Sequence, residues 1–239
     1  MASTIETEQA TRTVVQQLPA AFMLAMDTYS RGGELGFMGM DFYTCGRGGA
    51  LGEVDADVVA AGFVFFNPAL VREQWERGAA AMDRRAAAQV FIEVGHAWAA
   101  EHLADGVDYD RLNDLLGRVV AGADPGAAPL FAAWRAMPEP SDAKALTLHR
   151  LNVLRELRGG LHGACVVAAG LVPARAAQLN DPMMAGIFGW PEPPADIEDD
   201  RAAWDAAEEA TRAAVAATFA VLDDAERDEL IALSRAARG

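Results

Sequence analysis

Alanine supplies much of the apolar content of this chain, and this feature constrains the fold more than any other. Hydrophobic residues make up 52% of the 239 residues, but aromatic residues only 8%, and runs of β-branched residues are scarce. Alanine has the highest helix propensity, whereas strands are built from β-branched and aromatic side chains. The composition therefore predicts an all-α fold, with at most a small hairpin where glycines are dense.

Periodicity and capping residues predict about ten helices in one domain. Ser3 with Glu6 forms a capping box at the start of the first helix, and Asp223 with Glu226 forms another before the last helix. Pro19 is expected to interrupt the first helix, because proline removes a backbone donor and its ring clashes with the preceding turn. Helices should therefore cover the chain almost from end to end.

Two segments depart from this helical pattern. Eight glycines lie between Gly32 and Gly52, a density that favours positive φ angles and predicts an irregular segment. The prolines within Phe188–Pro194 predict a rigid, extended connector. The connector divides the chain into a core domain of residues 1–190, which holds the pocket, and a C-terminal two-helix appendage of residues 195–239.

The protein is acidic, with 35 acidic and 20 basic residues and a net charge of −15. Phosphate backbones and anionic membrane surfaces repel such a charge, since nucleic-acid affinity comes largely from Lys and Arg displacing counterions. The charge predicts no nucleic-acid partner and no membrane partner. One local cluster of basic residues is interpreted as a solvated helix face. Its members are Arg72, Arg77, Arg84 and Arg85.

Cysteine usage and the chain start indicate a cytoplasmic protein. Cys45 and Cys165 are too few for a disulfide framework and are typical of a reduced compartment. The first residues are polar and acidic, without the apolar region of a signal peptide. No uncharged apolar run reaches the ~18 residues that a membrane span needs.

The first group of candidate site residues lies in the segment from Leu154 to His162. If the helical phase persists, Arg155, Arg158 and His162 lie at i, i+3 and i+7, on one face. Two guanidinium groups and an imidazole can bind a carboxylate or phosphate, with His162 as acid, base or hydrogen-bond donor. The alternative is that these arginines pair with Glu156 and other carboxylates and fasten helices together.

The second group is the run from Tyr43 to Gly49. Its glycines let main-chain amides approach a ligand, and Arg47 balances an anion while Tyr43 lines the pocket. A nearby cation would lower the pKa of Cys45 and prepare it as a nucleophile, although a small packing residue is the favoured interpretation of Cys45. The loop is expected to fold against the helix that carries Arg158 and His162, so that both groups enclose one site.

A metal centre is not expected. Glu93 and His96 form one Glu-x-x-His motif, whereas a di-iron bundle needs two such motifs and two further glutamates. The spacing of the remaining histidines gives no support for a metal or haem site. No cofactor can be assigned from the sequence.

The sequence around both groups of residues resembles that of the SalK-type family of proteins from high-GC bacteria. The resemblance covers roughly residues 20 to 180. It rests on three stretches, Leu35–Gly52, Val58–Val71 and Leu154–Leu171. Some members lie in natural-product gene clusters, and members are often labelled helix-turn-helix. The resemblance therefore implies a pocket that includes Arg47, Arg155, Arg158 and His162, without naming a reaction.

This chain departs from the family pattern at several positions. Gly160 replaces a usual Asp, Cys45 replaces a small residue, and Gly48-Gly49-Ala50 replaces Ala-Ala-Pro. The winged-helix-like segment that follows the matched region in typical members is missing, since the Phe188–Pro194 connector leads directly to the last two helices. The missing Asp removes a local partner for the arginines and favours an anionic ligand.

Three functions fit these features. The leading interpretation is a small-molecule protein, a binding protein or an enzyme, that acts on a secondary metabolite with a carboxylate or phosphate and belongs to natural-product biosynthesis. The first alternative is a helical scaffold that oligomerises, supported by the Ala-rich helix of Arg201–Leu222; a homodimer is left open. The second alternative is a winged-helix-derived transcriptional regulator, disfavoured by the −15 charge and the missing winged segment.

Overall fold

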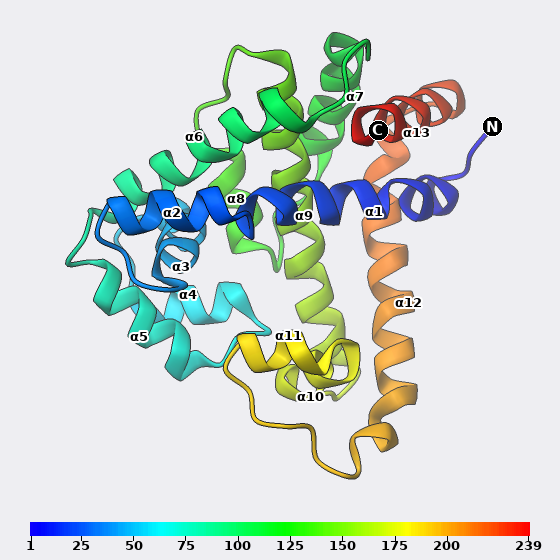
Figure 1. Cartoon of the computed structure of the whole chain (residues 1–239). Coiled ribbons are helices and arrows are strands. Elements are labelled where there is room, and N and C mark those ends of the chain that lie inside the picture. Colours follow the sequence, from blue (N-terminus) through cyan, green and yellow to red (C-terminus); the bar gives the residue numbers. More distant parts are fainter.

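The computed structural model describes residues 1–239 and contains helices but no strand, which confirms the all-α prediction. Figure 1 shows the helices gathered around the long helix α9. Three short 3-10 helices, Gly49–Leu51, Ile197–Asp200 and Phe219–Val221, connect them. The α-helices are α1 (Thr4–Met23), α2 (Met26–Glu34), α3 (Asp41–Gly48), α4 (Ala56–Phe63), α5 (Pro68–Gly78), α6 (Arg84–His102), α7 (Tyr109–Gly122), α8 (Pro129–Arg135), α9 (Ala143–Ala168), α10 (Pro173–Asn180), α11 (Pro182–Ile187), α12 (Arg201–Thr218) and α13 (Asp224–Arg238).

Both predicted capping boxes are present. The Ser3 amide donates to Glu6 over 2.7 Å while the Glu6 amide donates to Ser3 Oγ over 3.3 Å, and Asp223 and Glu226 make the same reciprocal pair at the start of α13. The predicted break at Pro19 is wrong, because α1 continues to Met23. Burial of the apolar face of α1 in the core stabilises the helix enough to tolerate one missing backbone hydrogen bond.

Helix α9 forms the centre of the molecule, and α1, α6, α7, α8 and α12 all pack against it. Its apolar residues join a single large core in which Trp134, Phe91 and Leu157 are almost fully buried. The helix runs without a break from Ala143 to Ala168, because Gly159 and Gly160 keep helical geometry.

The glycine-rich segment is less irregular than expected. Helices α2 and α3 cover most of it, and the non-helical part is confined to residues 35–40 and 52–55. The glycines of α3 and of the 3-10 helix that follows it allow close packing. A Cβ on Gly46 would lie 2.4 Å from the Phe91 ring, and one on Gly49 would lie 2.1 Å from the Arg84 carbonyl oxygen. Their missing side chains therefore let α3 approach α6, instead of creating a loop.

The last two helices pack against the rest of the chain. Helix α12 lies along α9 and α1, and α13 lies against α1 and α7, so that both ends of the chain are close together (Figure 1). Phe219, Leu222 and Leu230 join the main core. The connector has no helical structure at residues 190–194, as predicted. The division into domains at this connector stays a prediction.

No single helix combines the length and the apolar character that crossing a membrane requires. Helices α9 and α10 reach that criterion only when taken together, and a bend of 113° separates them.

Candidate functional site

Arg47 and Glu156 form a buried ion pair between α3 and α9. Arg47 donates from Nε and Nη2 to the two carboxylate oxygens of Glu156, over 2.8 and 2.7 Å, and the two side chains are 9% and 1% exposed. Arg155 adds a third hydrogen bond to Glu156 over 3.0 Å. Burial by itself raises the pKa of Glu156, but Arg47 and Arg155 outweigh it and hold the pKa below its ordinary value. The anion that Arg47 requires is thus an internal carboxylate.

Aromatic rings and a backbone contact surround the Arg47 side of this pair. The guanidinium lies over the Phe63 ring at 4.4 Å from the centroid, and its Nη1 donates to the Tyr43 hydroxyl over 3.4 Å. The indole of Trp134 donates to the Arg47 carbonyl oxygen over 3.1 Å. Arg47 and Tyr43 therefore belong to a desolvated structural cluster that joins α3, α4, α8 and α9.

Arg158 and His162 lie on another side of α9 and face α12. Arg158 donates to Glu208 over 3.1 Å, and Nε2 of His162 lies 3.4 Å from the same carboxylate. Nδ1 of His162 lies 3.0 Å from the hydroxyl oxygen of Thr211, and the Thr211 hydroxyl donates to the Ala207 carbonyl oxygen. Burial lowers the pKa of His162 to about 4, against the opposing effect of Glu208. Near neutral pH the imidazole is neutral.

One predicted group of residues is part of α9 and the other contacts α9 through Arg47, but the two groups do not enclose one shared pocket. An open polar pocket between α1, α9, α10 and α12 includes Arg158 and His162 and excludes Arg47. Its further lining residues are Arg12, Gln16, Asn180, Trp204 and Glu208. The partners on α12 were missed by the sequence analysis, because a separation of about 50 residues leaves no local signal. The predicted roles of both groups in ligand binding and catalysis stay predictions.

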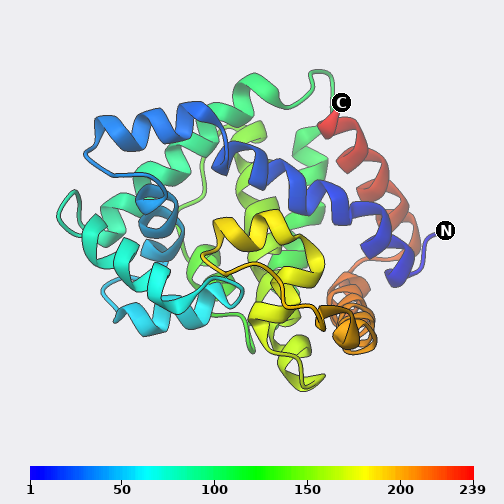
Figure 2. The same ribbon diagram turned by 60° about the horizontal axis from the view of Figure 1, so that its bottom comes forward.

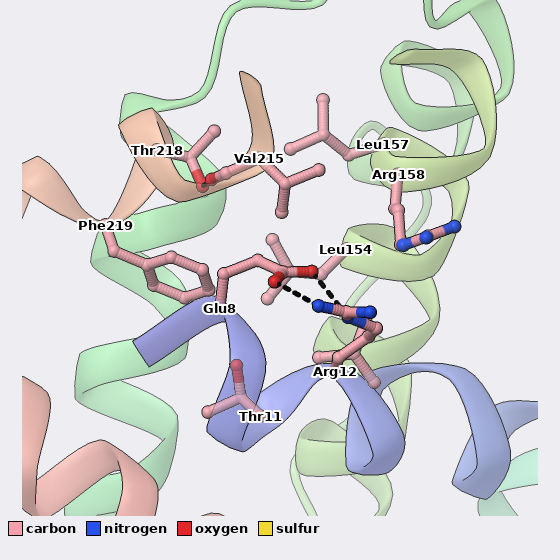
Figure 3. A pocket seen from close by; sticks show the side chains of 10 residues that line it. Glu8, Thr11, Arg12, Leu154, Leu157, Arg158, Val215, Thr218 and Phe219 are labelled. Carbon is pink, nitrogen blue, oxygen red and sulfur yellow. Dashed lines mark hydrogen bonds and ion pairs between the residues drawn. The ribbon is translucent and has the colours of Figure 1, made fainter. Parts of the chain in front are cut away.

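A second, smaller pocket lies between α1, α9 and α12 (Figure 3). Arg12 and Arg158 lie together at one side of it and Phe219 lies at the other. Arg12 is held by a bidentate ion pair with Glu8, over 2.9 Å at each contact. The charges at this pocket are therefore matched within the protein.

Cys45 is fully buried in the core. Burial raises the pKa of its thiol to about 11, and the guanidinium of Arg84, 3.6 Å from Sγ, lowers it by less. The net lowering of the pKa that a nearby cation was expected to cause does not occur, because the effect of burial outweighs that of Arg84. Desolvation keeps the thiol neutral, as in a packing residue.

Three buried polar side chains between α6 and α9 lack hydrogen-bond partners. They are His96 through Nε2, His149 through Nδ1, and Asn152 through both side-chain atoms. The two imidazole rings lie 5.9 Å apart. Burial lowers the pKa of His149 to about 4 and also lowers that of His96. No group of three or more His, Cys, Asp or Glu side chains is arranged to hold a metal ion.

Helices α4 and α5 are consecutive and pack against each other across a short turn. The four residues Val64–Asn67 join them, and the side chain of Asn67 caps α5 by accepting from the Ala69 amide over 2.9 Å. Pro68 occupies the first position of α5, where its missing backbone N–H costs no hydrogen bond. Helix α5 buries Val71, Gln74, Trp75 and Gly78, a spacing of one helical face, and exposes the opposite face with Arg72, Glu73, Glu76 and Arg77.

Several other helix pairs also have short connections, and two of them, α9–α10 and α12–α13, present unsuitable second helices. A four-residue turn also joins α9 and α10, yet residues 176–179 of α10 are buried and its Arg175 is paired with Asp196 and Asp200. Helix α13, which follows α12, carries Asp224 and Glu226 in its first turn. Of these three pairs, α4–α5 alone combines a short turn with an exposed second helix whose first turn has no acidic residue.

Comparison with known proteins identifies one family. A model of the helix-turn-helix family matches residues 8–238, and no curated protein or solved structure is similar enough to count as a match. The match contradicts two predictions from the sequence: the small-molecule protein as the leading function, and the absence of a nucleic-acid partner. The prediction of no nucleic-acid partner relied too much on the net charge, which does not determine the charge of a local surface. The prediction of a small-molecule protein relied too much on the polar motifs. Because the match covers almost the whole chain, this protein belongs to the helix-turn-helix family.

Proposed function

We propose that this protein is a DNA-binding transcriptional regulator in which α4 and α5 are the helix–turn–helix and α5 is the recognition helix. The observation that carries the proposal is the exposed face of α5. This helix follows a four-residue connection, and Arg72 lies on its exposed face near its N-terminal end. In helix–turn–helix proteins the second helix enters the major groove and its N-terminal residues contact base edges.

The ion pairs of α5 suggest which arginine is available to DNA. Arg72 pairs with Asp57, and the two side chains are 45% and 73% exposed. Such an exposed pair contributes little in water, so a phosphate or a guanine can replace the carboxylate at small cost. Arg77 instead binds Asp41 through two hydrogen bonds of 2.7 Å, and the Asp41 side chain is 1% exposed. Arg77 therefore fastens α5 to α3.

A second cation beside this unit has no carboxylate partner. Arg85, in the first turn of α6, is exposed and takes part in no ion pair. Its side chain lies against Gly52, which precedes α4 by a few residues. Arg72 and Arg85 together are few for a DNA-binding protein, and the net charge of −15 opposes association. Binding to arbitrary DNA should be weak, and tight binding should depend on base contacts from α5.

Selection from a random pool of DNA duplexes tests the proposal. The wild-type protein is expected to enrich a sequence motif, and Arg72→Ala should weaken binding to that motif by about tenfold or more, because a lost guanine or phosphate contact costs about 1–3 kcal/mol. Fluorescence anisotropy measures the affinities. Arg201→Ala is the matched control, since Arg201 is also about half-exposed and paired with a nearby glutamate, Glu198. Failure to enrich any motif would contradict the proposal.

Two finer statements accompany this proposal. A regulator of this kind acts on the chromosome, which agrees with the cytoplasmic location expected from the sequence. The resemblance of Leu35–Gly52 and Leu154–Leu171 to the SalK-type family supports placement of the chain in that branch of the helix-turn-helix proteins.

A further inference from the structure

The turn between α4 and α5 is held by a segment more than a hundred residues away in the sequence. The Asn67 amide donates to the Phe188 carbonyl oxygen over 2.8 Å, and Nδ2 of Asn67 donates to the Gly189 carbonyl oxygen over 2.9 Å. In the other direction, the indole Nε1 of Trp190 donates to the Phe65 carbonyl oxygen over 2.7 Å. Three hydrogen bonds thus join a four-residue turn to the three residues that follow α11.

Close packing accompanies these hydrogen bonds. The rings of Phe66 and Phe188 are stacked, with centroids 4.0 Å apart. Gly189 adopts a φ of 85°, and a Cβ at this position would lie 2.9 Å from the side chain of Leu70. In Figure 2 the segment after α11 crosses between the α4–α5 region and α12. Phe188–Trp190, which we name the turn clamp, therefore lies directly on the start of α5.

The turn contains a strained backbone conformation that contacts from outside the turn must stabilise. Val64 adopts a φ of 49°, a conformation that is unfavourable for a β-branched residue and persists only when surrounding contacts impose it. Asn67 both caps α5 and binds the turn clamp, so the same side chain sets where α5 begins and how it is anchored. A change in these contacts would alter the direction in which α5 leaves the turn.

We infer that Trp190 and Asn67 are positioning residues: the turn clamp fixes the orientation of α5 relative to α4, and so determines how well α5 fits a DNA groove. The part that concerns DNA rests on the proposed function. The clamp itself rests on the three hydrogen bonds, the ring stack and the strained turn. A recognition surface has to be held to a fraction of an ångström, and loops achieve this through supporting contacts from neighbouring segments.

Two variants of the full-length protein separate the clamp from general folding. Trp190→Phe keeps an aromatic ring and removes the donor to Phe65. Asn67→Asp keeps the oxygen that caps α5 and removes the donor to Gly189. Trp98→Phe is the matched control, because Trp98 is also partly buried, and its indole nitrogen makes no hydrogen bond. Hydrogen exchange of residues 64–71 and affinity for the enriched DNA motif are measured for each protein.

The clamp predicts that exchange in residues 64–71 becomes about tenfold faster in Trp190→Phe and Asn67→Asp, as expected when one hydrogen bond is lost. Exchange in α13 should stay the same, and Trp98→Phe should match the wild type. DNA affinity should fall about five- to tenfold in both clamp variants. Unchanged exchange in residues 64–71 would overturn the clamp.

The outcomes distinguish the clamp from the proposed function. If the wild-type protein binds DNA and the clamp variants exchange faster but bind equally well, the positioning role is wrong. If the wild-type protein binds no DNA, the proposed function is wrong, and the exchange data alone support or overturn the clamp. If Trp190→Phe fails to fold, Asn67→Asp provides the same two readings.

Discussion

Glu156→Gln is expected to lower the free energy of unfolding by about 3–5 kcal/mol, because it leaves the guanidinium of Arg47 buried without a counter-charge. Both side chains are almost fully buried, and Arg47 has no carboxylate partner other than Glu156. For a chain of this size the loss corresponds to a decrease in melting temperature of about 10 °C. Equilibrium denaturation in urea measures the change.

Two further variants establish that the unpaired charge causes the loss. Replacing both partners, as Arg47→Met with Glu156→Leu, should recover most of the stability, because a well-packed apolar pair leaves no buried charge. Glu34→Gln removes a carboxylate from the exposed pair with Arg31 and should change stability by less than about 1 kcal/mol. A Glu156→Gln protein as stable as the wild type would contradict a central role for this ion pair.

Acidification from pH 6.5 to pH 4 is expected to destabilise the protein through its buried histidines. The pKa values of His149 and His162 are lowered to about 4, whereas an unfolded histidine titrates near 6.5. Between these values the unfolded state binds more protons, so stability is complete above pH 6.5 and is lost as the pH falls. Each histidine accounts for about 3 kcal/mol over this range.

His149→Leu tests this origin of the acid sensitivity. The variant should have a shallower dependence of unfolding free energy on pH, by up to about 1.4 kcal/mol per pH unit between pH 6 and 4.5. His102→Gln is the control, because His102 is exposed and stacks on Trp98 at the surface. If His149→Leu and the wild type have parallel pH profiles, the burial of His149 does not cause the acid sensitivity.

The helical fold was predictable from the sequence because its signals are local. Helix propensity of alanine and the capping boxes of Ser3 and Asp223 act within one helical turn. The same local view misinterpreted the glycines around Gly46. Glycine favours loops in isolation, but here the missing side chain lets α3 lie against Phe91, and this packing outweighs the local preference.

For the candidate site, the sequence predicted individual residues but not their partners from distant segments. Arg47 does contact α9, as expected, but the sequence could not establish that Glu156 is its anion, because the pairing depends on how α3 crosses α9. Glu208 and Thr211 lie far along the chain from His162, and the turn clamp lies far from Asn67. The basic cluster that includes Arg72 was found and interpreted as a solvated face, since charge patterns alone do not reveal a helix–turn–helix.

The salt dependence of DNA affinity tests most directly the proposed DNA-binding surface, which consists of α5 and the start of α6. Each neutralised phosphate contributes a slope of about −0.9 to the logarithm of affinity against the logarithm of salt concentration, so phosphate contacts by Arg72 and Arg85 predict a slope of about −2. Arg72→Ala with Arg85→Ala should bring the slope close to zero. Arg201→Ala with Arg235→Ala, an equal change of charge on α12 and α13, should leave it near the wild-type value. Absence of DNA binding, or equal slopes for the two double variants, would contradict DNA recognition by α5.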